Sequence, residues 1–173
     1  MGLQMSDKTQ KAFVPDESNT RLLRDAFGRF ATGVTIVTAN TPEGVVAITA
    51  SSFSSVSLTP PMVLWSPDRN SRRFPYFEGA EHYAIHVLAA DQQELCYSVA
   101  KDAAGLRGLD LALNAEGVPV LEGCLARFEC TRHAVYDGGD HAIVLGVVNR
   151  AEMREEGEAL AFFKGQMGRI TAH

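Results

Sequence analysis

The sequence predicts a mainly β protein in which short antiparallel strands form a closed or nearly closed barrel with a few peripheral helices. Three observations support this fold class. At least six short runs are rich in β-branched or aromatic residues. Tight-turn signals at residues 41–44 and 137–140 connect neighbouring runs, and a helical repeat of apolar residues is clear only near residues 20–31 and 91–100. This combination is typical of antiparallel barrels, in which closure leaves no strand edge exposed.

The bulk properties narrow the class of protein further. The length of 173 residues favours one domain, residues 19–173, preceded by a polar arm over residues 1–18. The formal net charge of −5 argues against nucleic acid or an anionic membrane surface as the main partner. No apolar run is long enough to span a bilayer. The three cysteines form no CxxC pair and lack metal-binding spacing, which is expected of a protein in the reducing cytoplasm.

The first elements are a helix and a β-hairpin. The helix is expected over residues 20–31, where apolar residues recur at helical spacing and Asn19 or Thr20 can cap the start. The hairpin strands are expected at residues 34–39 and 45–50, because both are rich in valine and isoleucine. The Thr-Pro-Glu-Gly sequence between them favours a turn.

The middle of the chain alternates strands with short helices. Strands are expected at residues 62–66 and 82–88. Between them, residues 72–78 favour one short helical turn that Pro75 interrupts. Residues 91–100 favour a helix with an aspartate as N-cap at position 91 and a glutamate three residues later, the spacing of a capping box.

The C-terminal third is expected to contain long strands. Residues 101–119 hold three glycines and are expected to be irregular. Strands at residues 126–136 and 141–150 are joined by Asp-Gly-Gly-Asp, whose residues accept positive φ. The second strand is nearly all apolar, which is expected of a central strand covered on both faces. A last short strand is expected at residues 159–164.

The most informative stretch lies between the second and third strands. Five of the seven residues from 51 to 57 are serines. A core strand has little use for so many hydroxyls, because each buried hydroxyl needs a hydrogen-bond partner. A loop around an anionic or oxygen-rich ligand does use them, because small hydroxyl side chains let backbone and side-chain donors approach the ligand. A polar surface loop is the alternative, and the arginines that follow at positions 69, 72 and 73 favour a ligand site.

Three segments of the chain resemble the short-chain flavin reductases. They are residues 33–38, residues 49–64 with the serines followed by Ser-Leu-Thr-Pro-Pro, and the tripeptide Gly-Asp-His at 139–141. The resemblance covers about residues 20–170. It implies a six-stranded antiparallel split β-barrel of Greek-key type that forms a homodimer, with flavin bound near the subunit boundary. It also implies the reductase component of a two-component flavin monooxygenase.

The resemblance also implies two sets of binding residues. The residues expected to contact the flavin, FMN or FAD, are Thr49, Ala50, Ser51, Ser52, Ser54, Ser55, Val56, Ser66, Pro67, Ser71, Arg72, Ala89, Ala90 and Gln92. Asp140, His141, Phe163 and Arg169 are expected near NADH or NADPH, with His141 donating to the dinucleotide and Asp140 orienting the imidazole. No side chain is expected to act as a catalytic acid or base, because the flavin itself accepts the hydride.

Three residues depart from the family pattern or are unusual in it. His86 and Met167 stand where the family suggests Asn and Tyr, and Trp65 is uncommon at its position. Met167 and Trp65 are expected to shape the slot beside the flavin ring. His82 and His86 share a strand face, but no carboxylate or cysteine completes a ligand set, so no metal site is expected.

The expected function is an NAD(P)H-dependent flavin reductase that supplies reduced flavin to a partner monooxygenase. The chain has no nucleophile-elbow motif, HExxH, P-loop or GxGxxG, so neither a hydrolase nor a dinucleotide-binding domain of its own is indicated. Alternatives are an FMN-bound reductase of another acceptor such as a cobalt corrinoid, a non-enzymatic flavin- or haem-binding split barrel, and a pyridoxamine-phosphate oxidase type of barrel. The choices between FMN and FAD, and between NADH and NADPH, stay open.

Overall fold

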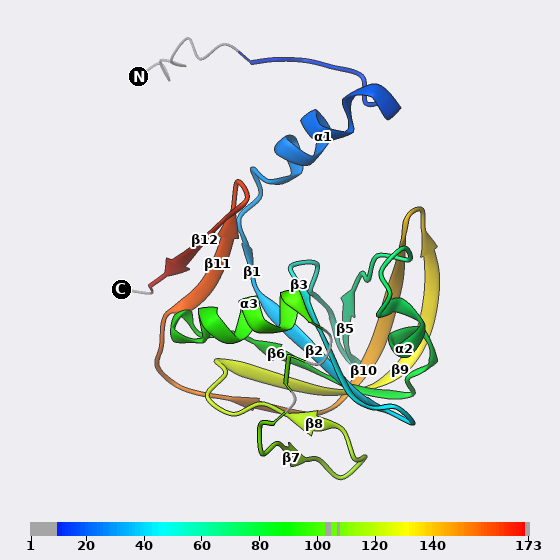
Figure 1. Ribbon diagram of the computed structural model, residues 1–173, viewed down its shortest axis with the longest axis vertical. Helices are drawn as coiled ribbons and strands as arrows, with labels where there is room; N and C mark the ends of the chain where they lie inside the picture. Colours follow the sequence, from blue (N-terminus) through cyan, green and yellow to red (C-terminus); the bar gives the residue numbers. More distant parts are fainter. Residues whose placement is uncertain (1–9, 103–104, 107, 172–173) are drawn as a thin grey trace.

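The computed structural model describes residues 10–102, 105–106 and 108–171, and the fold is mainly β (Figure 1). The strands are β1 (Thr32–Gly33), β2 (Thr35–Thr41), β3 (Gly44–Ala50), β4 (Ser54–Leu58), β5 (Pro61–Trp65), β6 (His82–Val87), β7 (Ala112–Leu113), β8 (Pro119–Val120), β9 (Ala126–Gly138), β10 (His141–Met153), β11 (Ala159–Phe163) and β12 (Gln166–Ile170). The helices are α1 (Thr20–Phe27), α2 (Phe74–Gly79) and α3 (Gln93–Lys101), with 3-10 turns at Glu17–Asn19 and Ala90–Gln92. The main sheet is antiparallel in the order β3-β2-β6-β9-β10-β5-β4. A smaller sheet has the order β1-β11-β12, and β7 pairs with β8.

The first hairpin is confirmed. Strands β2 and β3 pair from Thr35 opposite Ala50 to Thr41 opposite Gly44. Gly44 has a φ of 108°, a conformation that residues with a side chain avoid. On its other side β2 pairs with β6, so this strand lies inside the sheet.

Helix α1 is shorter than the predicted residues 20–31. It ends at Phe27, with Gly28 as C-cap. The Asp16 side chain caps the preceding 3-10 turn, and Asn19 accepts a hydrogen bond from the Asp16 backbone instead of capping α1. No residue of α1 is buried, and in Figure 1 the helix extends away from the main sheet.

The serine-rich stretch is a loop only in its first half. Residues 51–53 are irregular, whereas residues 54–58 form β4, which pairs only with β5 at the edge of the main sheet. The argument against a strand holds for a buried strand. It fails here because an edge strand exposes its side chains, so water can satisfy the hydroxyls.

Two helix predictions are corrected in detail. Pro75 lies in the first turn of α2, where its missing N–H has no intrahelical acceptor, so it does not interrupt the helix. Helix α3 begins at Gln93 rather than directly after Asp91. Residue 92 is the N-cap of α3, but its side chain caps no N–H of that helix. The Gln92 Oε1 instead accepts the Ala89 N–H at 3.0 Å, on the other side of the 3-10 turn.

The two long strands are confirmed, and both run further than predicted. Strands β9 and β10 pair from His141 opposite Gly138 to Met153 opposite Ala126. Strand β10 lies between β9 and β5, as expected of a central strand. Strand β12 was missed because its sequence is mostly polar or glycine, and the short pair β7–β8 lies in the region expected to be irregular.

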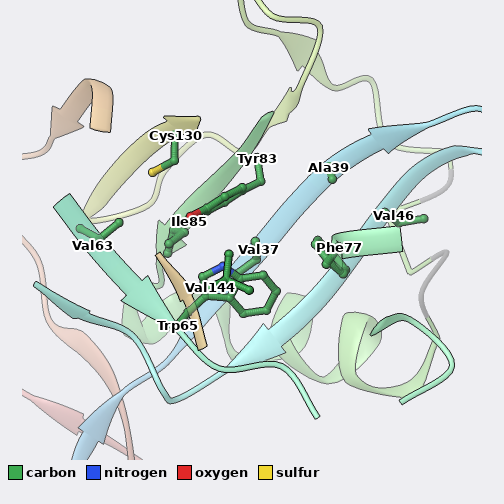
Figure 2. Close-up of a cluster of buried hydrophobic side chains, with 10 residues drawn as sticks. All are labelled: Val37, Ala39, Val46, Val63, Trp65, Phe77, Tyr83, Ile85, Cys130 and Val144. Atoms are coloured by element: carbon green, nitrogen blue, oxygen red, sulfur yellow. The ribbon is translucent and has the colours of Figure 1, made fainter. Parts of the chain in front are cut away.

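One hydrophobic cluster connects strands from both ends of the main sheet (Figure 2). It extends from Val46 of β3 to Val63 of β5, with Trp65, Phe77 and Tyr83 among its members. The rings of Trp65 in β5 and Tyr83 in β6 have centroids 6.1 Å apart. These strands are three places apart in the sheet order, or roughly 14 Å in a flat sheet, so the contact indicates that the sheet curls. The hydrogen-bond ladders among the described residues still leave β3 and β4 as edges of a seven-stranded sheet, so a closed six-stranded barrel is not seen.

The two residues expected to shape the slot beside the flavin ring both pack against hydrophobic clusters, and their effect on the slot stays a prediction. Trp65 is 0% exposed and packs edge-on against Phe77, with ring centroids 5.3 Å apart. Met167 packs against a second cluster that contains Val34 and Leu160. No helix in the described part of the chain has the length and apolarity needed to cross a bilayer.

Candidate functional site

One serine side chain joins the serine-rich loop to the end of β5. Ser52 Oγ accepts a hydrogen bond from the Ser66 N–H at 2.8 Å and donates to the Ser66 carbonyl at 3.3 Å. Nearby, Thr35 Oγ1 donates to the Ala50 carbonyl at 2.8 Å. These bonds hold the backbone of residues 50–52 against Ser66, so predicted flavin residues from two segments lie side by side.

The loop after β5 in turn holds the tip of the β9–β10 hairpin. The Ala142 N–H donates to the Pro67 carbonyl at 3.0 Å, and the Arg69 N–H donates to the Asp140 carbonyl at 2.9 Å. The Arg69 guanidinium also donates to the His141 carbonyl at 3.2 Å. The structure thus brings the predicted flavin residue Pro67 next to the predicted dinucleotide residues Asp140 and His141.

The imidazole of His141 is oriented by its neighbour. Its Nδ1 lies 2.7 Å from Asp140 Oδ1, so Nδ1 carries a proton and donates to the carboxylate. This hydrogen bond is the main reason why the pKa of Asp140 lies below its ordinary value. The His141 side chain is 43% exposed, and its Nε2 has no hydrogen-bond partner within the described residues. A ligand beside the hairpin can therefore use Nε2.

The three arginines after β5 differ in their hydrogen-bond partners. Arg69 holds the hairpin tip. The Arg73 guanidinium donates to two carbonyls at the C-terminal end of α3, at 2.6 and 3.2 Å, and to one carbonyl in β3 at 3.2 Å. Arg72 is exposed, and its guanidinium makes no hydrogen bond to any described residue. Arg72 is therefore the arginine of this turn that is free to meet a phosphate.

The segment after β6 uses its polar groups within the fold. Gln92 Oε1 accepts the Ala89 N–H, and Gln92 Nε2 donates to the Glu122 carbonyl at 3.0 Å. The Ala90 N–H donates to the Glu158 carbonyl at 2.9 Å. Both ends of the Gln92 amide are engaged, so this side chain positions the segment.

The remaining predicted residues lie on exposed surfaces. Ser54, Ser55 and Val56 are exposed on β4. Phe163 is 43% exposed at the end of β11, and Arg169 donates to Glu158 Oε2 at 2.9 Å. No hydrogen bond among the described residues connects them to the hairpin tip, so their roles stay predictions.

His86 is a structural residue. The Leu121 N–H donates to its Nε2 at 3.1 Å, so Nδ1 carries the proton and donates to the Ile36 carbonyl at 3.0 Å. Burial lowers the pKa of His86 to about 4. Both ring nitrogens are occupied by the protein, so His86 ties β6 to β2 and to the segment after β8.

A cavity of about 390 Å³ opens between α1, the serine loop and the β11–β12 turn. Its lining residues are Arg24, Asp25, Phe27, Gly28, Arg29, Phe30, Thr32, Ser51, Phe162, Lys164 and Gly165. Ser51 was predicted to contact the flavin, whereas the α1 residues were missed. The sequence predicts that Arg24 and Arg29 lie on the solvated face of an amphipathic helix, and no sequence pattern places residues 162–165 beside that helix. The one sequence feature that could have indicated a site is that these arginines lie close to Phe27 and Phe30.

A second cavity, of about 590 Å³, lies beside the β7–β8 pair and the far ends of β9 and β10. It is lined by an ion-pair network in which the buried Glu129 carboxylate accepts from Arg127 at 3.1 Å and from Arg150 at 2.9 Å. Asn114 also donates to Glu129, at 3.1 Å. These charges largely compensate one another, and no predicted site residue lines this cavity. The ion pairs of this lining connect β9 to β10, and the cavity is not part of the predicted site.

Comparisons with known proteins show the family of this chain. Residues 27–171 match the family described as flavin reductase like domain. The FMN reductase (NADH) SmoA of Agrobacterium fabrum is 51% identical over 162 residues, which cover 94% of this chain and 92% of the relative. The reductase subunit HsaB of a flavin-dependent monooxygenase of Rhodococcus jostii is 36% identical over 165 residues, or 94% of this chain and 84% of the relative.

A solved structure is similar over nearly its whole length. The NADH:FAD oxidoreductase SgcE6 of Streptomyces globisporus has a TM-score of 0.86 at 34% identity, covering 94% of this chain and 99% of that chain. The same protein has been solved in complex with NAD and FAD fragments. The family match includes both the serine-rich stretch and the β9–β10 hairpin tip.

Proposed function

Because the chain belongs to the flavin reductase-like family, we infer that it is an NAD(P)H-dependent flavin oxidoreductase. It transfers a hydride from nicotinamide to flavin and supplies the reduced flavin to a partner monooxygenase. One observation in the structure carries this function. Hydrogen bonds between Ser52 and Ser66, and from the Ala142 N–H to the Pro67 carbonyl, join the serine loop and the Gly-Asp-His hairpin tip to the same loop after β5.

On the flavin side, the proposed binding wall runs along residues 49–56 and the end of β5. Exposed Ser51 offers N–H and O–H donors to the oxygen-rich flavin ring and ribityl chain. Ser52 shapes the wall through its bonds to Ser66. The free guanidinium of Arg72 supplies a cation for the flavin phosphate.

On the dinucleotide side, the proposed contact is His141. Asp140 holds the imidazole at Nδ1, which leaves Nε2 to bond the amide or a phosphate of NADH or NADPH. When bound, the flavin supplies the hydride-accepting atom, so these residues need only position the two ligands and limit the access of water.

The finer architecture is also part of this proposal. A homodimer with a six-stranded split barrel in each subunit is supported by the curl of the main sheet and by α1, which has no buried residue. Leu22, Leu23 and Ala26 give α1 an apolar face, which a second copy of the chain would cover. The arm was expected over residues 1–18, of which residues 1–9 lie outside the described residues. The described part, residues 10–18, would pack on that copy, and the protein would act in the cytoplasm.

The other predicted functions are not favoured. The relatives are named as flavin reductases or as reductase components of monooxygenases. None of the relatives compared above is named as a corrinoid reductase, a flavin- or haem-storage protein or a pyridoxamine-phosphate oxidase.

The direct test is NADH consumption by the purified protein, with and without added FMN or FAD, after a visible spectrum has been recorded. The protein should oxidise NADH when flavin is present, and a yellow preparation would indicate that flavin stays bound. Ser52→Tyr should prevent flavin binding, because the larger side chain fills the wall between residues 52 and 66. Absence of NADH oxidation with either flavin would contradict the proposed function.

A further inference from the structure

The cavity beside the β7–β8 pair lies over alternating charges on two paired strands. In the β9–β10 ladder Arg150 is opposite Glu129, and Glu152 is opposite Arg127, so these four side chains share one face of the sheet. All four line the cavity, whose volume is about 590 Å³. A volume of this size is typical of sites that bind small molecules.

The most buried charged group of the lining is the Glu129 carboxylate. It accepts hydrogen bonds from Arg127 at 3.1 Å, from Arg150 at 2.9 Å and from Asn114 at 3.1 Å. Arg127 also pairs with Glu152. Buried charges lose their water, so such a network adds little net stability compared with apolar packing of the same volume. What the network does provide is a fixed position for the Arg150 guanidinium beside the cavity.

Arg150 has one edge of its guanidinium free. Its Nη1 donates to Glu129, whereas Nε and Nη2 form no hydrogen bond with any described residue, and the side chain is 54% exposed. The Nε and Nη2 groups of a planar guanidinium donate in parallel, so together they match the two oxygens of a carboxylate. The anchored arginine is therefore oriented for a bidentate pair with a carboxylate.

Arg154 adds a second positive charge to the lining. Its guanidinium donates to two backbone carbonyls, at 2.7 and 3.2 Å, and forms no ion pair with any described residue. Two lining carboxylates, Glu129 and Glu152, are already paired with arginines. The third, Glu122, is exposed and forms no ion pair within the described part of the chain. An anion in the cavity therefore meets two available cations and one opposing charge.

The rest of the lining is largely apolar. Val120 and Leu121 are buried, whereas Leu113 is 58% exposed and Met153 is 81% exposed. A hydrocarbon group that covers such exposed apolar side chains removes their surface from water, which favours binding. The flexible thioether of methionine adapts to ligands of different shape. The ligand class indicated is therefore a carboxylate carried on an apolar body.

We propose that this cavity binds a small organic acid. The carboxylate pairs with the free edge of Arg150, and the apolar part lies against Leu113 and Met153. The site is separate from the hairpin corner, because in Figure 1 the β7–β8 pair lies at the opposite end of the molecule from α1 and from the β9–β10 tip. It is also independent of the proposed function, because no predicted site residue lines this cavity.

The test is an NMR titration of the full-length protein with 3-phenylpropionate and with 3-phenylpropionamide. The two probes have nearly the same shape, and only the first carries a carboxylate. The acid should bind with a dissociation constant of about 1 mM or lower, and the amide about tenfold more weakly, because it lacks the charge-assisted pair. The backbone amide signals of residues 112–122 and 150–154 should shift on binding.

Variants of the lining identify the contacts. Arg150→Gln should weaken binding of the acid about tenfold, and Arg150→Lys about threefold, because lysine keeps the charge without the paired donors. Glu122→Gln should strengthen it about twofold, because an exposed opposing charge is removed. The matched control is Arg132→Gln, because Arg132 also lies on β9, donates to the Glu78 carbonyl and is outside the cavity. It should bind the acid like wild type.

Three outcomes would overturn the inference. They are no binding of the acid at about 10 mM, equal affinity for the acid and the amide, or shifts confined to residues outside the cavity. An unchanged dissociation constant in Arg150→Gln would also overturn it, provided that Trp65 fluorescence shows a folded core. If that variant fails to fold, Met153→Ser decides, because this exposed side chain should cost about threefold in affinity and an unchanged value rejects the site.

Discussion

Acidification should weaken the fold through His86, which joins β6 to β2 and to the segment after β8. Its Nε2 accepts the Leu121 N–H, and its Nδ1 donates to the Ile36 carbonyl. Protonation would remove the acceptor and leave a cation in the core, close enough to Arg127 to feel its charge. Burial is the main cause that lowers the pKa of His86 from its ordinary 6.5 to about 4, and the charge of Arg127 lowers it further.

The sign and size of the effect follow from the two pKa values. In the unfolded chain His86 titrates near 6.5, so between pH 6.5 and about 4 the unfolded state binds a proton that the folded state does not. The stabilisation by neutral His86 is complete above pH 6.5 and is lost as the pH falls toward 4. At 1.36 kcal/mol for each pKa unit, the difference corresponds to about 3 kcal/mol.

Urea unfolding at several pH values between about 7.5 and about 4.5, at one protein concentration, measures this effect. Trp65 is the single tryptophan and is 0% exposed, so its fluorescence reports on the core. His86→Asn should be less stable than wild type at neutral pH by about 1–3 kcal/mol, because the Leu121 N–H loses its acceptor. The variant should also lose less stability on acidification.

His82→Asn is the matched control, because His82 lies on the same strand with a side chain that is 33% exposed. It should show the wild-type dependence of unfolding free energy on pH. Parallel pH dependences for wild type and His86→Asn would refute the reasoning, because the titrating group would then lie elsewhere.

Three further predictions concern the site and the core. Ser52→Ala should lower the free energy of unfolding in urea by about 1–2 kcal/mol and should weaken flavin binding, measured by fluorescence titration, because both hydrogen bonds to Ser66 are lost. If both values stayed unchanged, Ser52 would not hold the serine loop against Ser66. His141→Ala should reduce the efficiency with NADH about tenfold while flavin still binds, and His133→Ala on the same hairpin should have no effect; equal effects of the two variants would remove His141 from the site. Gly146→Ala should cost about 1–3 kcal/mol, because its Cβ would collide with the Tyr83 hydroxyl, and adding Tyr83→Phe should restore part of the loss; no recovery in the double variant would place the strain elsewhere.

The hairpins could be predicted from the sequence because their signals are local. Gly44 and Gly139 adopt φ values of 108° and 76°, which favour glycine, and the strands beside them are rich in β-branched residues. The caps were less predictable, because neighbouring polar residues compete for the same backbone groups. Asp91 had the better sequence signature, yet Gln92 reaches the Ala89 N–H and also bonds to Glu122.

The roles of the polar side chains in and around the core were also hard to predict, because their hydrogen-bond partners are distant in the sequence. Sequence reasoning noted His86 for its spacing from His82, but its role depends on Leu121, which is distant in the sequence. It assigned Arg72 to the flavin and gave Arg69 and Arg73 no specific partner. The structure separates them, because Arg73 meets the carbonyl end of α3 and Arg69 meets the hairpin, whereas Arg72 has no such acceptor among the described residues.

The sequence by itself determined the mainly β class, the hairpins and the three segments that resemble the family, because each depends on residue types at short spacing. Tertiary structure alone decided that the serine loop and the hairpin tip are both bonded to the loop after β5, and that α1 meets the β11–β12 turn. Residues 24–32 and 162–165 are separated by about 130 positions in the sequence. Their meeting depends on strand order and register, which set the pairing of Thr32 with Phe162 and which no local pattern in the chain specifies.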